Sequence, residues 1–180
     1  MEDTPKVKVT DRREKLQEDL ARLNRRIAML EANHHKLEPI IQLAEASLPE
    51  HVLAEIQMLP EITWDNTEHV EIEIEAQNVR SWADMQSLLE GLDALGYDMD
   101  GWKSHDNAKY FQRTYQWKRN GFGIRIEAKL DEATTECRRV LVRVEHYHGH
   151  SYTEEVYAFD CGEGAEEVIR KANEEVKEDI

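Results

Sequence analysis

A heptad repeat of apolar residues near the N-terminus most constrains how this chain folds. From residue 16 the apolar positions are spaced alternately four and three residues apart, with leucine at d (Leu16, Leu23, Leu30, Leu37) and Leu20, Ile27, His34 and Ile41 at a. A helix that only covers a globular core shows a broader stripe, whereas a narrow seam over more than three heptads is typical of a coiled coil. We therefore predict that this segment is a helical arm that forms a homodimer.

The flanking charges and the following segment leave two arrangements open. In a parallel dimer, Arg26 at a g position would face Glu31 at an e position of the partner, which supports the parallel orientation, and aliphatic a residues with leucine at d favour two strands. Alternatively the seam packs against a second helix of the same chain. Ser47-Leu48-Pro49-Glu50 has a capping-box spacing with proline near the first turn, which predicts such a helix over residues 49–59.

The remainder of the chain reads as one α+β domain. Residues 68–76 alternate strictly between apolar and mostly acidic side chains, which predicts a half-buried strand. A helix follows Ser81 and ends near Gly96, and a last helix begins at Glu163. The other predicted strands are β-type runs joined in pairs, the first pair through Asn120-Gly121: 110–118 and 122–130, then 137–147 and 152–161.

These elements define the expected fold class. The simplest arrangement is a two-layer α+β sandwich, in which a mostly antiparallel five-stranded sheet carries both helices on one face. We divide the chain into a coiled-coil dimerisation arm (1–48), a short connecting helix (49–62) and an acidic α+β domain (63–180).

The charge is distributed unevenly. The chain has 38 acidic and 23 basic residues, a net charge of −15, but residues 1–41 contain eight acidic and nine basic residues, so residues 42–180 carry −16. Such a body repels phosphate backbones and attracts basic surfaces, so we expect a basic protein partner and no direct nucleic-acid binding. The expected partner-binding residues are glutamates on the first strand and the last helix: Glu71, Glu73, Glu75, Glu163, Glu166, Glu167, Glu174 and Glu175.

The sequence also bears on the compartment. No apolar run approaches the roughly 18 residues of a membrane span, and the start MEDTPKVKVT lacks the apolar core of a signal peptide. We expect a cytoplasmic protein without membrane contact. In that reducing compartment Cys137 and Cys161 would remain thiols.

Three histidines cluster in the stretch EHYHGHSY, residues 145–152: His146, His148 and His150. The first two would share one strand face, and the third could complete a zinc site with three nitrogen ligands. The segment HGHSY resembles the HGH-x-[YF] metal-binding element of the 6-pyruvoyl-tetrahydropterin synthase family, which implies His148 and His150 as zinc ligands. That family also uses an upstream histidine and a nearby cysteine nucleophile, whereas here the upstream histidine is His105 and Cys137 lies within a predicted strand.

The other reading of this stretch is the tip of a β-hairpin, since Gly149 can supply the positive φ of a tight turn. Two registers are possible. A turn centred on Gly149 places Cys137 opposite Cys161, Val142 opposite Val156 and Arg143 opposite Glu155, whereas a two-residue turn at Gly149-His150 places Val142 opposite Tyr157 and Val140 opposite Phe159. We expect the hairpin tip and therefore no cofactor, with zinc as the alternative.

No phosphate-binding loop, dinucleotide fingerprint, zincin helix or nucleophile elbow occurs in the sequence, so we do not expect an enzyme. The chain resembles, in size and organisation, the small acidic accessory and host-inhibitor proteins of bacteriophages. That resemblance implies a dimer whose acidic domain binds and inhibits a basic host protein such as a nuclease or defence factor, including by nucleic-acid mimicry. The alternatives are a small metal-dependent enzyme or ligand-binding domain using the three histidines, and a structural protein whose function is the dimer itself.

Overall fold

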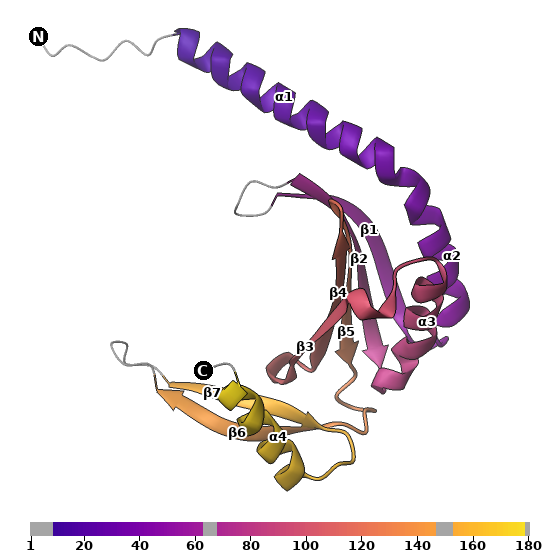
Figure 1. Ribbon diagram of the computed structural model, residues 1–180, viewed down its shortest axis with the longest axis vertical. Helices are drawn as coiled ribbons and strands as arrows, with labels where there is room; N and C mark the ends of the chain where they lie inside the picture. Colours follow the sequence, from indigo (N-terminus) through magenta and orange to yellow (C-terminus); the bar gives the residue numbers. More distant parts are fainter. Residues whose placement is uncertain (1–8, 63–67, 147–152, 179–180) are drawn as a thin grey trace, which may run out of the picture.

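The computed structural model describes residues 9–62, 68–146 and 153–178. A long helix at the N-terminal end leads into a five-stranded sheet, and a smaller C-terminal unit lies at the far end of that sheet (Figure 1). Within the described ranges, no helix combines the length and the apolar character that crossing a membrane would require.

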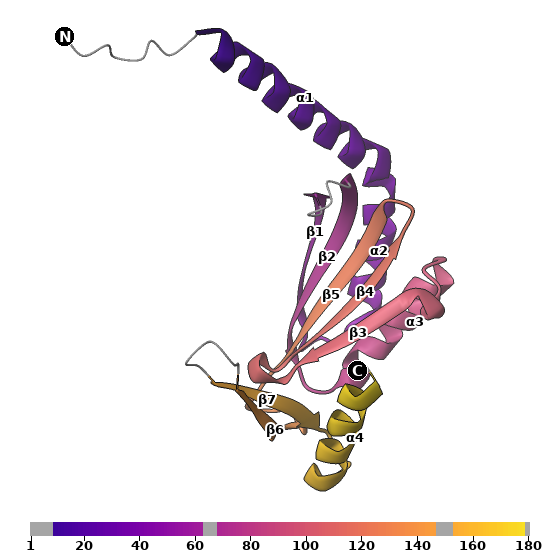
Figure 2. The ribbon, with the colours of Figure 1, turned by 60° about the vertical axis from the view of Figure 1, so that its left-hand side comes forward.

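The N-terminal arm is helical but not continuous. Helix α1 (Val9–Asn33) passes through a 3₁₀ turn at His34–Lys36 into α2 (Leu37–Ser47). Only the second part lies against the sheet along its length, while α1 projects beyond the sheet in both views (Figures 1 and 2). The predicted helical arm is therefore present, with a bend in the middle of the heptad repeat.

The main sheet has the order β1-β2-β5-β4-β3. Its neighbours pair antiparallel except for β2 and β5, which are parallel. This architecture confirms a mixed α+β protein with a mostly antiparallel five-stranded sheet. The strands are β1 (Leu53–Ile62), β2 (Glu68–Val79), β3 (Trp102–Asn107), β4 (Gln112–Arg119) and β5 (Phe122–Leu130).

The predicted helix over 49–59, and with it the connecting helix in 49–62, is wrong, because residues 53–62 form strand β1. Ala54 and Ile56 are two residues apart, as on one face of a strand, and they also lie three or four residues from other apolar residues, as on one face of a helix. The spacing in this short segment therefore fits a strand as well as a helix. As a strand, these residues lie opposite Ala76 and Ile74 of β2, and the pairing supplies backbone hydrogen-bond partners along the outer edge of β2. Tertiary context therefore overrides local helix propensity here.

The C-terminal hairpin does not join the main sheet. Strands β6 (Arg138–His146) and β7 (Thr153–Asp160) form their own two-stranded sheet, and α4 (Ala165–Glu178) packs on them. The prediction that both body helices cover one face of a single sheet is therefore wrong for the last helix. Edge strands β1 and β3, which the sequence did not suggest, complete the five-stranded sheet instead.

The core lies between the main sheet and the helices α2 and α3 (Gln86–Ala94). One face of β2 is fully buried there, and β5 contributes the matching row. Helix α3 begins after a 3₁₀ turn, Trp82–Met85, and Gly96 follows its C-terminal end with a φ of +97°, which suits glycine. The largest fully buried side chains are Ile40, Val70, Ile72, Ile74, Val79, Met85, Leu88, Leu92, Ile124, Ile126 and Leu130.

Two of the local signals are confirmed in detail. Asn120 and Gly121 have φ values of 52° and 74°, as a two-residue hairpin turn between β4 and β5 requires. At the start of the helix after Ser81, the Asp84 carboxylate accepts the N–H groups of Arg80 at 2.8 Å and Ser81 at 3.3 Å. Burial raises the pKa of Asp84, but these hydrogen bonds and His51 outweigh it, so the pKa is lowered.

The C-terminal hairpin contains both of the registers that the sequence left open. The pairs from Arg138 opposite Asp160 to Leu141 opposite Tyr157 have the register of a turn centred on Gly149. From Arg143 opposite Val156 onward, the pairing is shifted by one residue and has the register of the two-residue turn. Val142 is the extra residue at this bulge and pairs with neither of its two predicted partners. A bulge therefore reconciles the two registers.

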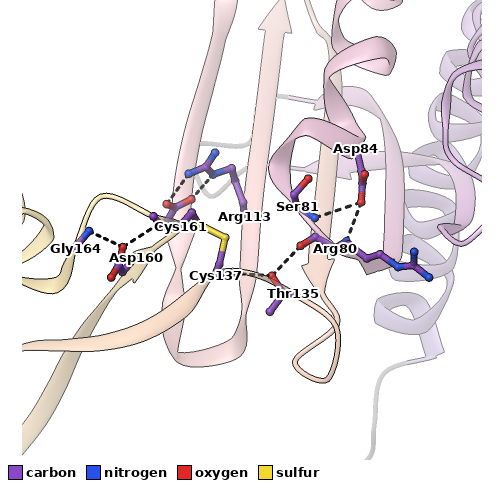
Figure 3. Close-up of a disulfide and its surroundings, with 11 residues drawn as sticks. Arg80, Ser81, Asp84, Arg113, Thr135, Cys137, Asp160, Cys161 and Gly164 are labelled. Atoms are coloured by element: carbon purple, nitrogen blue, oxygen red, sulfur yellow. Dashed lines mark hydrogen bonds and ion pairs between the residues drawn. A yellow bond between two sulfur atoms is a disulfide. The ribbon is translucent and has the colours of Figure 1, made fainter.

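Cys137 and Cys161 form a disulfide at the open end of this hairpin (Figure 3). The expectation that they remain thiols is wrong, because the register near the strand ends brings them directly together. Three hydrogen bonds anchor the region: Thr135 donates through Oγ1 to the carbonyl of Arg80 at 2.8 Å, and Asp160 accepts the N–H groups of Gly162 and Gly164. The disulfide therefore closes the C-terminal unit beside its junction with the main sheet.

An aromatic cluster holds the C-terminal unit on the main sheet. The Phe159 ring of β7 meets the rings of Trp82 and Phe111 edge-on, with centroids 5.4 and 5.8 Å apart. The guanidinium of Arg139 in β6 lies over the Phe111 ring at 5.7 Å. Such contacts add to the area that the rings bury, so the junction is apolar and specific.

Reduction of the disulfide is expected to loosen the C-terminal unit alone. A loop that spans 24 positions, closed by a disulfide, restricts the unfolded chain by about 3 kcal/mol. Hydrogen exchange measured by mass spectrometry should therefore accelerate in β6, β7 and α4 after reduction while β2 and β5 keep their protection. Reductant should change nothing further in a Cys137→Ser, Cys161→Ser variant, and uniform acceleration across both sheets would contradict the prediction.

Candidate interaction surfaces

The most exposed apolar surface lies on α1. Leu16, Leu20, Leu23 and Ile27 have exposed fractions of 63, 59, 54 and 45%. These four residues, which we call the α1 stripe, occupy the first half of the predicted seam. Monomeric proteins seldom expose contiguous apolar surface of this kind, so the α1 stripe is a candidate binding surface.

The second half of the seam faces its own body. Leu30 and Leu37 are partly buried and pack against the core, and Ile41 lines a groove beside β1. His34, in the 3₁₀ turn, is exposed. The predicted dimer-interface residues are therefore divided between an exposed stripe and contacts within the chain.

Glutamates of β2 lie on the side of the main sheet opposite the helices, which we call the polar face. Glu71 and Glu73 are buried there despite their charge, and Glu75 is half-buried. Buried carboxylates need compensating partners. They are therefore poor candidates for free surface charge, in contrast to their expected role in partner binding.

The partners of these glutamates come from the neighbouring strands. Glu73 forms an ion pair with Arg125 of β5 and accepts a hydrogen bond from Gln57 of β1 at 2.8 Å. Arg125 also reaches Glu127 at 2.9 Å. Partial burial lowers the pKa of Arg125, but Glu127 and Glu73 outweigh it, so the pKa is raised and the charge stays fixed.

Gly123 makes room for Glu71 in this network. A Cβ at Gly123 would lie 3.2 Å from Oε1 of Glu71 and 3.3 Å from the Trp117 carbonyl oxygen, which is tighter than ordinary contact. Gln116 donates to the same carboxylate at 3.4 Å. The arrangement places Arg125, Gln57 and Gln116 against the carboxylates of Glu71 and Glu73.

Exposed acidic charge gathers on the helical layer instead. Glu38 and Glu45 of α2 and Glu90 and Asp93 of α3 are all exposed, and neither helix contains lysine or arginine. We call these four residues the acidic helical face. Sequence reasoning missed it because helix periodicity identifies the buried stripe but does not reveal which two helices lie side by side.

The glutamates of α4 are placed differently. Glu167 pairs with Arg170 at 2.6 Å and Glu163, just before the helix, pairs with Lys171 at 2.6 Å. Glu166 is exposed. The side chains of Glu174 and Glu175 lie outside those that the structure describes.

The histidine cluster falls largely outside the described residues. His148 and His150 lie in the undescribed segment 147–152, and of His146 only the backbone, at the end of β6, is described. Among the residues that the structure does describe, no group of three or more His, Cys, Asp or Glu side chains is placed to hold a metal ion.

A groove runs beside the edge strand β1. Its walls come from α2 and from the helix-facing side chains of β1, and its volume is about 440 Å³. Glu45 and Glu50 lie at its border. The lining residues are Ile41, Ala44, Glu45, Leu48, Pro49, Glu50, Val52, Ala54 and Ile56, and we call this feature the β1 groove.

Comparison with known proteins adds no assignment to these surfaces. No protein-family model, no curated protein and no solved structure matches the chain.

The charge network of the polar face leads to a stability prediction. Arg125→Met leaves Glu73 buried without its counter-ion and with only the Gln57 hydrogen bond, which should lower the free energy of unfolding by about 2 to 3 kcal/mol in urea titrations. Adding Glu73→Met to that variant should recover most of the loss. The control is Lys129→Met on the same strand, an exposed residue whose replacement should change stability little; equal losses for both single variants would contradict the network.

Proposed function

We propose that the protein is a non-enzymatic, dimeric interaction protein whose acidic body binds and inhibits a basic partner protein. The observation that carries the dimer is the α1 stripe, four large apolar residues on a helix that projects beyond the sheet (Figure 2). Covering it with the same stripe of a second copy removes apolar area from water on both chains.

An antiparallel arrangement of the two α1 helices fits this geometry. Residues 16, 23 and 30 lie on nearly the same side of a helix, since an ideal helix drifts only about 20° per heptad. Because Leu30 packs on the body, a parallel partner helix would run into that body after Ile27. In an antiparallel pair the partner's body lies at the opposite end, past the free end of α1, and only the first turns of the partner helix lie beside residues 28–34.

The charges beside the α1 stripe support the same arrangement. When Leu20 packs opposite the partner's Leu23, and Leu16 opposite the partner's Ile27, the flanking Asp19 lies near the partner's Arg26. Symmetry creates this opposite-charge pair twice. In this antiparallel dimer, the pair of Asp19 with the partner's Arg26 takes the place of the pair of Arg26 with the partner's Glu31 that a parallel dimer would form.

The net charge supports a basic partner. Residues 42–180 carry −16, and the acidic helical face offers four exposed carboxylates without a lysine or arginine on either helix. A surface of this kind attracts the basic clefts that bind nucleic acids, which is the physical basis of mimicry. A nuclease or defence factor with such a cleft is the class of partner that we propose.

Disruption of the α1 stripe should produce monomers. Leu20→Lys with Leu23→Lys removes apolar contacts that only a second chain would make, so light scattering should show the monomer mass while the urea midpoint hardly changes. Ala21→Lys with Ala28→Lys is the matched control, because it adds the same charge at exposed positions outside the stripe. A wild-type monomer at high concentration, or a dimeric stripe variant, would reject this dimer.

The orientation of the helices can be measured separately. In an Arg12→Cys variant, a thiol-reactive spin label attaches only to the new cysteine, because Cys137 and Cys161 form a disulfide. In the antiparallel dimer the two labels lie 19 residues apart along the axis, about 29 Å at 1.5 Å per residue. In a parallel dimer they lie about 10 Å apart across the helix pair.

Partner binding should depend steeply on salt and on the acidic helical face. A basic protein captured from host lysate should be released between about 0.1 M and about 1 M salt, as the Debye length falls from about 10 Å to about 3 Å. Glu38→Gln, Glu45→Gln and Glu90→Gln together should weaken capture. Capture that is indifferent to both salt and these substitutions would rule out an electrostatic partner.

A further inference from the structure

The outer edge of β1 is available for pairing. β1 is an end strand of the main sheet, and within the described ranges no strand pairs with its outer side. At the far end of the strand the Pro60 carbonyl accepts a hydrogen bond from Arg26 of α1 at 3.3 Å. The open stretch is therefore residues 53–58. An edge strand exposes backbone donors and acceptors that can bind an extended peptide.

The β1 groove would receive alternate side chains of such a peptide. Ala54 and Ile56 point to the helix side of the sheet, where Ile41, Ala44 and Leu48 of α2 form the opposite wall. In an added strand, every second side chain falls on this side. Apolar side chains at those positions would fill the groove.

On the other side of the sheet, three carboxylates form a row. Glu55 of β1 lies directly opposite Glu75 of β2, and Glu75 lies directly opposite Glu127 of β5. Arg125 reaches Glu127, but within the described part of the chain neither Glu55 nor Glu75 forms an ion pair. Like charges in adjacent positions destabilise a sheet, and the exposed Glu55 has an open position on its outer side.

We propose that the β1 edge binds an extended segment of a basic partner as a sixth strand. Its apolar residues occupy the β1 groove, and the intervening lysine or arginine lies opposite Glu55 and relieves the carboxylate row. Glu45 and Glu50 at the groove border add attraction for further basic residues. This inference rests on the proposed basic partner and specifies which part of that partner binds and where.

A second copy of β1 is a poor occupant of the same edge. Antiparallel pairing of two β1 strands about their centre would bring Glu55 close to the partner's Glu55 and extend the carboxylate row. Charged residues on edge strands prevent pairing between copies in this way. With a basic peptide, the residue opposite Glu55 is a lysine or arginine, so repulsion between like charges becomes attraction between opposite charges.

The test uses the capped peptide Val-Lys-Val-Lys-Val-Lys and its Val-Glu counterpart. The Val-Lys peptide should shift the amide resonances of residues 53–58 and of α2 in the wild-type protein. Glu55→Lys should weaken this binding about tenfold and should gain affinity for the Val-Glu peptide, a reversal that a purely structural role of Glu55 would not produce. The control Glu132→Lys makes the same charge change at an exposed position between β5 and β6 and should leave binding unaltered.

Backbone pairing is tested with the same peptide methylated on every backbone nitrogen, which removes the N–H donors of both strand edges and should bind neither the wild-type protein nor the Glu55→Lys variant. Absence of wild-type binding at millimolar peptide, equal affinity for wild type and Glu55→Lys, or shifts confined to the acidic helical face would each overturn the edge site. In those cases an intact dimer and salt-dependent capture would leave the proposed function standing. Binding of the Val-Lys peptide alongside failed capture would support the edge site and reject the inhibitor function.

Discussion

The two faces of β2 organise this protein. Val70, Ile72, Ile74 and Ala76 are completely buried toward the helices, while the intervening glutamates lie on the polar face. Burial of each large aliphatic side chain contributes about 1.5 to 3 kcal/mol. The apolar side of β2 packs against helices α2 and α3. Its charged side needs hydrogen-bonding and oppositely charged partners, such as Gln57 and Arg125.

The apolar stripe of the N-terminal arm, which the 3₁₀ turn at His34–Lys36 interrupts, divides into two parts. Its second half, including Leu30 and Leu37, belongs to the body, whereas the α1 stripe extends the same side of the helix beyond the body. Because α1 carries both Leu30 and the α1 stripe, the orientation of any partner helix is constrained by the body that already occupies one end of α1. The dimer that we propose follows from that steric relation and from the heptad spacing together.

Charge also serves different purposes in different places. Glu71 and Glu73 of β2 are buried and accept hydrogen bonds from neighbouring strands, Glu163 and Glu167 near the start of α4 are paired with Lys171 and Arg170, and the carboxylates of the acidic helical face are exposed. Net charge by itself did not distinguish these groups. Glu55 differs from all of these carboxylates, because it ends the row formed with Glu75 and Glu127 and lies at the open edge of β1, where we propose that a basic peptide binds.

Local periodicity in the sequence determined the strand at 68–76 and its two faces, the hairpin at Asn120-Gly121 and the helix between Ser81 and Gly96, because each depends on neighbours a few residues apart. The tertiary structure alone decided that residues 53–62 form a strand, that β2 and β5 run parallel, and that Cys137 bonds to Cys161. It also decided which glutamates are buried. These outcomes depend on contacts between segments distant in sequence, where a short apolar segment adopts the structure that completes a sheet edge.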